Sequence, residues 1–362
     1  MNGPATTNEL PEIGKISSEI FDEIIFPMLG RPDQTLLVPP QHGVDFGVID
    51  IGAGNVMCLT SDPVFVVPQY GWERAAWFAV HILASDAATS GLSPRYLAID
   101  LNLPMSITKD DLVTLWRAVH KECDKLGISV VTGHTARYQG TDYPMIGGAT
   151  MMAIGPRAKY VTPAMASAGE DIVITKGPAI EASALFAVTF PKRVEKAYGA
   201  AFAKRAEQVF WQMSVVEDAL TAASVGVREE GVTAMHDATE CGLWGGLYEV
   251  ARASGVGMRV EMEKIPVQEE VRKVCELFGI DPFCSISEGT LVLSCKKHKT
   301  AEVLTRFKAK GILAASIGET LPEAHGITLV EGGRERPLEH PRVDPFWKAY
   351  GQAMAEGDVR AS

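Results

Sequence analysis

The sequence contains no run of apolar residues long enough to cross a membrane. A spanning helix needs about 20 such residues in succession, and no window of the 362-residue chain approaches that length. The N-terminal stretch MNGPATTNELPEIGK also lacks the basic start and apolar run of a secretory signal. We therefore expect a cytoplasmic protein that does not act on membranes.

Positive charge is also scarce. The chain has 34 basic and 45 acidic residues, which gives a formal net charge of -11. Proteins are drawn to nucleic acids by clustered positive charge, so this balance argues against a nucleic-acid partner. The charges are scattered along the chain and predict solubility.

Cysteine pairs are missing as well. The six cysteines are dispersed with no Cys-x-x-Cys spacing. The sequence therefore predicts neither a zinc knuckle nor a disulfide framework. Most are expected to be buried thiols. Cys241 is the exception, because it lies near the start of a predicted helix, where the pKa of a thiol is lowered.

The length and the 46% hydrophobic content are sufficient for two cores. We expect an N-terminal arm over residues 1–40, a first domain over 41–158, a second domain over 170–331 and a C-terminal tail over 332–362. Strands and helices alternate in both halves, so the predicted fold class is α/β or α+β.

The first half predicts two helices and a strand. Residues 72–91 are apolar almost all round, which is typical of a buried helix. Residues 108–127 form an amphipathic pattern in which Thr108 and Asp111 have capping-box spacing. ISVVTGHT, residues 128–135, predicts a strand that runs into a glycine turn.

The second half begins with DIVITKGPAIEASALF, which predicts a strand, a Gly-Pro turn and a helix, and it predicts two further helices. One is a long helix over residues 199–224. The other begins within MHDATECGLWGGLYEVARASGVG, where Leu243, Leu247 and Val250 form an apolar stripe and Gly255 ends the helix.

Four aspartates have similar surroundings, each flanked by apolar or small residues at the end of a strand or helix. They are Asp45, Asp62, Asp86 and Asp237. Such a carboxylate is costly unless it binds a cation, accepts N–H bonds or is paired. Few basic residues lie near them, so a shared Mg²⁺ with substrate phosphates is one interpretation. Four separate turn or cap residues are the other.

Six further residues are candidates for contacts with an anion or for proton transfer. In TGHT, Gly133 and Thr135 lie where backbone N–H groups could approach an anion, and His134 is a ligand, a proton shuttle or a turn residue. Glu288 precedes a glycine and an apolar strand, a position that suits either a general base or a turn residue. Lys15 is either solvated or folded over a phosphate. His236 is as ambiguous as His134.

Several blocks together resemble the aminoimidazole ribonucleotide (AIR) synthase, or PurM-like, superfamily. They occur in consistent order from about Gly14 to Val330, and they are TSDPVFV, SDAATSG, VTGHTA, MHDATECGLWGGLYEVARASGVGMRVEMEKIPV and FGIDPFCSISEGTLVL. The superfamily includes selenophosphate synthetase, thiamine-monophosphate kinase and the hydrogenase-maturation carbamoyl dehydratase HypE. The similarity is closest to HypE-like and AIR synthase-related proteins.

The resemblance implies a two-domain fold, in which a four-stranded N-terminal sheet mediates a homodimer and an α/β domain follows. It implies that ATP binds along the N-terminal domain and that Mg²⁺ is held by Asp45, Asp62, Asp86 and Asp237. Implied phosphate contacts are Lys15, Gly133, Thr135 and Thr239, and Glu288 and His134 are implied in proton transfer. The implied reaction is phosphorylation of a carbonyl or carboxamide oxygen, on a small molecule or on a partner protein.

Three departures from the HypE pattern limit this transfer. Gly133, His134, Thr135 and Ala136 stand where HypE has Gly-Asp-Thr-Lys. Glu240 and Cys241 replace Arg-Gly after the Asp-x-Thr element. The chain ends AEGDVRAS rather than Pro-Arg-(Ile/Val)-Cys, so we expect no carbamoyl transfer to a terminal cysteine.

Three alternatives remain open at this point. The chain is a nucleotide-binding accessory subunit in metallocentre assembly, a selenophosphate-synthetase-like or small-molecule kinase, or a transfer enzyme that uses the thiol of Cys241. The retained aspartates favour an enzyme over a pure scaffold.

Overall fold

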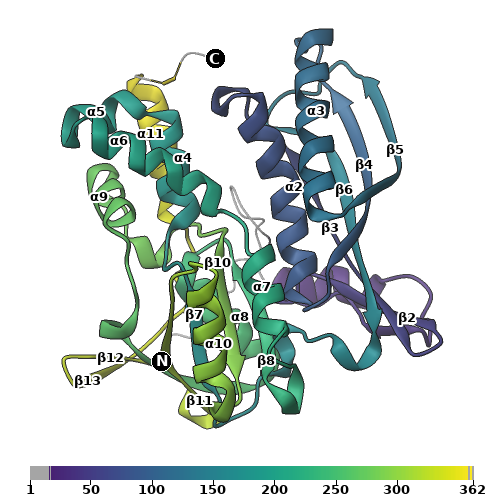
Figure 1. Ribbon diagram of the computed structural model, residues 1–362, viewed down its shortest axis with the longest axis vertical. Coiled ribbons are helices and arrows are strands. Elements are labelled where there is room, and N and C mark those ends of the chain that lie inside the picture. Colours follow the sequence, from purple (N-terminus) through teal and green to yellow (C-terminus); the bar gives the residue numbers. More distant parts are fainter. Residues whose placement is uncertain (1–15, 17, 358, 361–362) are drawn as a thin grey trace.

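The structure is a computed structural model that describes residues 16, 18–357 and 359–360, so Lys15 lies outside the described residues. Two sheets organise the chain (Figure 1). Within the predicted N-terminal arm, the chain forms three short helical turns, Ser18–Ile20, Phe21–Ile25 and Phe26–Met28. Within the described residues, no helix is both long enough and apolar enough to cross a membrane.

The first sheet has six strands in the order β1-β2-β3-β6-β4-β5. Their bounds are β1 Leu36–Val38, β2 Gly47–Gly52, β3 Asn55–Phe65, β4 Pro94–Leu103, β5 Ser129–Arg137 and β6 Met145–Pro156. The resemblance implied four strands. The sheet is larger because β2 pairs with β3 as a hairpin and the short β1 pairs with β2.

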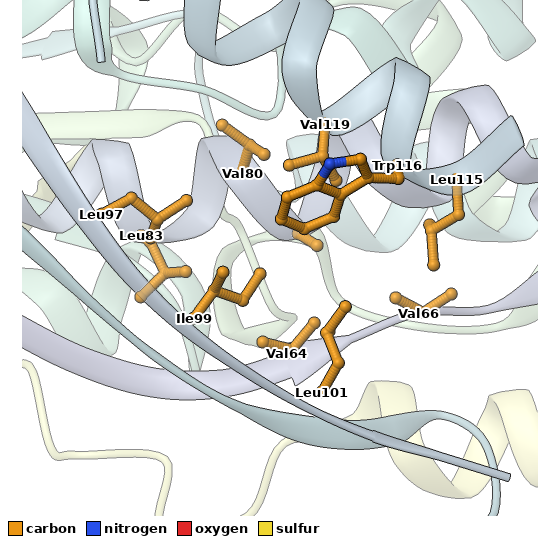
Figure 2. A pocket seen from close by; sticks show the side chains of 11 residues that line it. Val64, Val66, Val80, Leu83, Leu97, Ile99, Leu101, Leu115, Trp116 and Val119 are labelled. Carbon is orange, nitrogen blue, oxygen red and sulfur yellow. The ribbon is translucent and has the colours of Figure 1, made fainter. Parts of the chain in front are cut away.

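Helices α2 (Trp72–Thr89) and α3 (Lys109–Leu126) pack against this sheet. Figure 2 shows apolar side chains of both helices meeting those of β3 and β4, among them Val64, Leu83, Ile99 and Leu115. The space left between them is about 10 Å³, no more than one water molecule needs. This region is therefore a packed core.

The two helix predictions for the first half are confirmed. Helix α2 is buried along most of its length. At the start of α3, the Thr108 hydroxyl accepts from the Asp111 N–H at 3.2 Å and the Asp111 carboxylate accepts from the Thr108 N–H at 3.0 Å. Gly127 closes α3 with φ 70°, a left-handed conformation that glycine adopts without steric cost.

The predicted glycine turn at residue 133 is wrong. Strand β5 continues through Gly133 to Arg137 and pairs in parallel with β4. Gly133 serves strand packing, since a Cβ atom there would lie 2.0 Å from the carbonyl oxygen of Ile99.

The second sheet has seven strands in the order β13-β12-β9-β11-β7-β10-β8. Their bounds are β7 Asp171–Thr175, β8 Val232–Ala238, β9 Val256–Glu261, β10 Thr290–Cys295, β11 Ala314–Pro322, β12 Ile327–Glu331 and β13 Arg334–Pro337. The helices of this half are α4 Ile180–Thr189, α5 Pro191–Tyr198, α6 Ala200–Gln208, α7 Val216–Ala223, α8 Gly242–Ser254, α9 Glu269–Phe278, α10 Lys297–Ala309 and α11 Pro345–Glu356.

The single long helix predicted over residues 199–224 is broken. Helix α6 tightens into the turn Val209–Gln212, and α7 begins only at Val216. Between them, the Ser214 carbonyl accepts from Lys176 Nζ at 2.6 Å and the Val215 N–H donates to Ser85 Oγ at 3.0 Å. Tertiary bonds thus replace helical ones at the break.

Helix α8 agrees with the sequence prediction. Its apolar stripe, including Leu243, Leu247 and Val250, is buried, and Gly255 ends it at φ 63°. The helix begins directly after β8, so this strand and helix form the predicted corner.

Candidate active site

The structure brings the four predicted aspartates together from distant parts of the chain. Asp45 precedes β2, Asp62 lies near the end of β3, Asp86 lies in the last turn of α2 and Asp237 lies near the end of β8. Helix α2 makes this possible because it packs against its own sheet and also contacts α7 and β8 of the second half (Figure 1).

Asp237 is the most constrained member of the cluster. Its side chain is 0% exposed, and neither carboxylate oxygen meets hydrogen-bond geometry with a donor among the described residues. Burial, followed by the charge of Asp45, raises its pKa to about 6. A carboxylate in this position calls for a cation.

Asp86 is held beside Asp237 by a neighbouring hydroxyl. Thr60 Oγ1 on β3 donates to Asp86 Oδ2 at 2.8 Å. Burial, the charges of Asp237, Asp62 and Asp45, and a hydrogen bond with Asp62 raise the pKa of Asp86 well above its usual value. The mutual effect of these carboxyl groups shows that they share one site.

His236 lies inside the same cluster, although its sequence context left its role open. Its Nδ1 atom is 2.7 Å from Asp45 Oδ2, and its Nε2 atom is 2.8 Å from Glu249 Oε2 on α8. Burial alone would lower the pKa of His236, but these two carboxylates outweigh it and hold the pKa well above the usual value. Glu249 had no distinguishing sequence signal other than its place about two turns into an amphipathic helix.

Glu288 faces the cluster from the turn before β10. It is 2% exposed, and burial together with the charges of Asp237 and Glu181 raises its pKa well above the usual value. The Glu288 N–H donates to Glu181 Oε2 at 3.1 Å. Lys176 Nζ donates to the carbonyl of the next residue, Gly289, at 2.9 Å.

Sequence reasoning missed Glu181 and Lys176. Lys176 is 8% exposed and also contacts Asp218 at 3.0 Å, so a buried cation fixes the turn that carries Glu288. The Thr-Lys-Gly-Pro segment at the end of β7 was the available signal, since it places a lysine directly after a buried strand.

The residues present fit a divalent cation. Ligand atoms of Asp45, His236 and Asp237 all lie within 4.8 Å of one another. Among the described residues the cluster carries more acidic than basic groups, and neither oxygen of the fully buried Asp237 carboxylate meets hydrogen-bond geometry with a donor there. Oxygen-rich sites of this kind bind Mg²⁺ and Mn²⁺.

Within a single chain, the Thr-Gly-His-Thr segment of residues 132–135 lies apart from the aspartate cluster. Asp62, Ala149, Ile99 and Gly133 form one row across four adjacent strands. Three strand spacings separate Asp62 from Gly133, or about 14 Å. His134 is exposed, with Nε2 3.0 Å from the Tyr138 hydroxyl, and Thr135 is exposed on the same edge strand.

The corner after β8 is closed by the C-terminal segment. The Cys241 N–H donates to Asp344 Oδ2 at 2.8 Å, and Asp344 Oδ1 accepts from the Phe346 N–H at the start of α11. The Thr239 carbonyl accepts from the Ser287 N–H at 3.2 Å, which joins this corner to the Glu288 turn. Cys241 is buried, so its thiol is not presented to solvent.

Two family models cover most of the chain. The AIR synthase related protein N-terminal domain matches residues 43–154, and the corresponding C-terminal domain matches residues 167–331. The chain belongs to the AIR synthase related family. The two-domain, two-sheet architecture is therefore the family fold.

Curated relatives from this family carry hydrogenase-maturation names. A putative hydrogenase expression/formation protein of Methanocaldococcus jannaschii is 26% identical over 341 residues, which cover 92% of this chain and 96% of the relative. The carbamoyl dehydratase HypE of Escherichia coli is 28% identical over 305 residues, 82% of this chain and 85% of HypE.

Solved structures agree in fold. Hydrogenase maturation protein HypE in complex with ATP has a TM-score of 0.63 at 20% identity and covers 92% of this chain and 97% of its own. AaThiL complexed with AMPPCP and TMP has a TM-score of 0.63 at 19% identity, covering 81% of this chain and 88% of its own. These likenesses confirm the family architecture.

Proposed function

We propose that this protein is a Mg²⁺-dependent, ATP-using enzyme that phosphorylates a carbonyl or carboxamide oxygen. The observation that carries the proposal is the Asp237 carboxylate, which is fully buried among acidic groups and has no donor among the described residues. The solved complex of HypE with ATP and the carbamoyl dehydratase name of the E. coli relative support ATP and a carboxamide-type acceptor.

Six of the predicted site residues have a place in this proposal. The four aspartates would hold Mg²⁺, which when bound neutralises charge on the phosphates. Thr239 lies at the α8 corner next to Asp237 and would orient a phosphate from there. Burial and neighbouring carboxylates raise the pKa of Glu288, which suits a group that would supply or receive the proton at the acceptor.

Exchange of Asp237 for Asn tests the metal site. The amide keeps the shape but removes the charge, so we expect Mg²⁺-dependent phosphate release from ATP to fall at least about 100-fold. Asp124→Asn on the exposed face of α3 is the matched control and should retain activity. Hydrolysis that survives in Asp237→Asn would overturn the proposal.

ATP binding is measured alongside hydrolysis. Tight binding without turnover, in the presence of carboxamide-bearing small molecules and candidate partner proteins, would indicate an accessory subunit instead. The HypE–HypF complex among the solved structures makes a protein-borne acceptor a reasonable first substrate to try.

We further propose a homodimer through strand β5. This edge strand is exposed from Ser129 to Thr135, and Val130 and Val131, on its opposite faces, are 41% and 52% exposed. A long unpaired apolar edge is normally covered. A second copy would also be needed to bring Gly133, His134 and Thr135 to a carboxylate cluster, because they lie about 14 Å from Asp62 within one chain.

Sedimentation equilibrium tests the dimer. We expect a dimer at micromolar concentration for the wild type and a monomer for Val131→Glu. Val343→Glu is the control, since Val343 is 77% exposed and far from β5 in the sequence. A monomeric wild type at these concentrations would contradict the proposal.

We also propose two domains, over residues 41–158 and 170–331. We propose that the protein acts in the cytoplasm. All six cysteines are free thiols, which suits a reducing compartment.

A further inference from the structure

A surface cavity of about 330 Å³ lies where the two halves of the chain meet. Helices α2 and α3, which pack side by side (Figure 1), form two of its walls, and the turn Val209–Gln212 of the second half forms the third. Small-molecule sites have volumes of about 300–1,000 Å³. The residues that line the cavity do not include any of the candidate active-site residues. It is therefore a candidate for a second binding site.

Two indole rings form an apolar corner of this cavity. The rings of Trp77 on α2 and Trp211 in the turn lie 5.3 Å apart between centres, at an angle of 86°. Trp77 is stacked on His81 at 4.1 Å, and His81 Nδ1 bonds Ser214 Oγ at 2.8 Å, so the Trp77 ring is held in place. Trp211 is 42% exposed. An aromatic ligand would cover this exposed ring, and aromatic pairs attract each other beyond the area that they bury.

The buried part of the lining is electrically balanced. Glu122 on α3 is 7% exposed and accepts a hydrogen bond from Lys125 Nζ at 2.8 Å. His81 Nε2 lies 3.7 Å from Glu122 Oε2. Interactions with His81 and Lys125 lower the pKa of Glu122 to about 2. This carboxylate is therefore ionised and already has partners, so it does not require a charged group on a ligand.

The rim of the cavity presents one negative and one positive charge. Glu73 on α2 and Lys121 on α3 are exposed side chains that line the cavity. Within the described part of the chain, neither side chain has an ion-pair or hydrogen-bond partner, and the two do not pair with each other. Because they line the same cavity without meeting, both charges are available to a ligand that carries a negative and a positive group.

We propose that this cavity binds a free aromatic α-amino acid, with its carboxylate on Lys121, its ammonium group on Glu73 and its ring against Trp77 and Trp211. The charges disfavour simpler ligands. A phosphate or a dicarboxylate would meet the carboxylate of Glu73 and only one unpaired lysine, and an aromatic cation would meet the ammonium group of Lys121. Binding in this cavity does not depend on ATP or on a metal ion, so it is separate from the proposed function.

Isothermal titration calorimetry of the full chain with L-phenylalanine tests the site. We expect a Kd below about 1 mM. 3-Phenylpropionate lacks the ammonium group and 2-phenylethylamine lacks the carboxylate, so each should bind about threefold to tenfold more weakly. L-Alanine lacks the ring and should bind at least about tenfold more weakly. No binding of L-phenylalanine at about 10 mM would overturn the proposal, and so would equal binding of all four compounds.

Single substitutions test each contact separately. Trp211→Ala should weaken the binding of L-phenylalanine at least about tenfold, because it removes the exposed indole. Lys121→Gln should weaken L-phenylalanine and 3-phenylpropionate about threefold to tenfold and leave 2-phenylethylamine unchanged. Glu73→Gln should weaken L-phenylalanine and 2-phenylethylamine by a similar factor and leave 3-phenylpropionate unchanged. Charge variants that affect all three compounds equally would overturn the assignment of the two charges.

Two variants outside the cavity serve as controls. Lys109 is exposed at the start of α3 and does not line the cavity, so Lys109→Gln should bind L-phenylalanine as the wild type does. Asp237→Asn should do so as well, since the cavity shares no residue with the candidate active site. Loss of binding in Asp237→Asn, or unchanged binding in Trp211→Ala shown to be folded by circular dichroism, would overturn this site. ATP hydrolysis that persists in Asp237→Asn would overturn only the proposed function.

Discussion

The carboxylate of Asp237 is an unfavourable feature for stability and a useful one for binding. It is fully buried, and its charge lies near the other acidic groups of the cluster. Such a group destabilises the metal-free protein, because neither water nor a donor solvates its charge. Sites that sacrifice stability in this way are typically functional.

The pKa of Asp237 predicts a pH dependence of stability. It is 3.8 for an ordinary aspartate and about 6 in the folded protein. Between these values the folded state holds the proton more tightly than the unfolded state, so the free energy of unfolding falls as pH rises from about 4 to 6 and stays lower above. A difference of about 2 units corresponds to roughly 3 kcal/mol.

Urea unfolding in EDTA at pH 4.5 and pH 7.5 measures this effect. Asp237→Asn should gain up to roughly 3 kcal/mol over the wild type at pH 7.5 and much less at pH 4.5. Added Mn²⁺ or Mg²⁺ should stabilise only the wild type. A difference that is the same at both pH values would show that Asp237 does not titrate in this range.

At the scale of elements, Gly133 in strand β5 has a different role from the one that its sequence context predicts. Thr-Gly-His-Thr has the composition of a turn, and glycine there suggested a loop around an anion. The actual requirement is the close approach of a neighbouring backbone, since the Ile99 carbonyl occupies the space of a Cβ atom at Gly133. The sequence of β5 alone cannot show that the Ile99 carbonyl lies so close to Gly133.

Gly133→Ala should therefore destabilise the N-terminal sheet. A methyl group 2.0 Å from a carbonyl oxygen forces β4 and β5 apart, and we expect a loss of roughly 2–4 kcal/mol. Gly351→Ala in α11 is the control, because nothing lies within 4 Å of its added Cβ. It should be neutral or stabilise by up to about 1 kcal/mol. Equal melting temperatures for both variants would contradict this reading of β5.

At the scale of the whole molecule, the C-terminal segment is part of the second core. Phe346 of α11 is 1% exposed and packs edge-on against Phe186 at 5.1 Å between ring centres. Asp344 at the start of α11 bonds the Cys241 N–H at the α8 corner. The segment predicted as a tail thus connects a helical core to the edge of the candidate site.

Phe346→Ala should destabilise the protein by roughly 3–5 kcal/mol, since it removes a buried ring from a tight aromatic cluster. Lys348→Ala on the exposed side of the same helix should change stability by less than about 0.5 kcal/mol. Denaturant unfolding compares the two. Similar small effects would mean that α11 is not a cooperative part of the fold.

The sequence by itself determined the α/β architecture, the capped helix α3 and the corner between β8 and α8, and it singled out four aspartates as candidates for one site. Periodicity, caps and the surroundings of a charge are local properties, so they can be read along the chain. Tertiary structure decided the break after α6, the strand at Gly133, and the partners of His236 and Glu288. Those outcomes depend on a distant lysine, a neighbouring carbonyl and carboxylates from other elements, and such contacts exist only once the chain has folded.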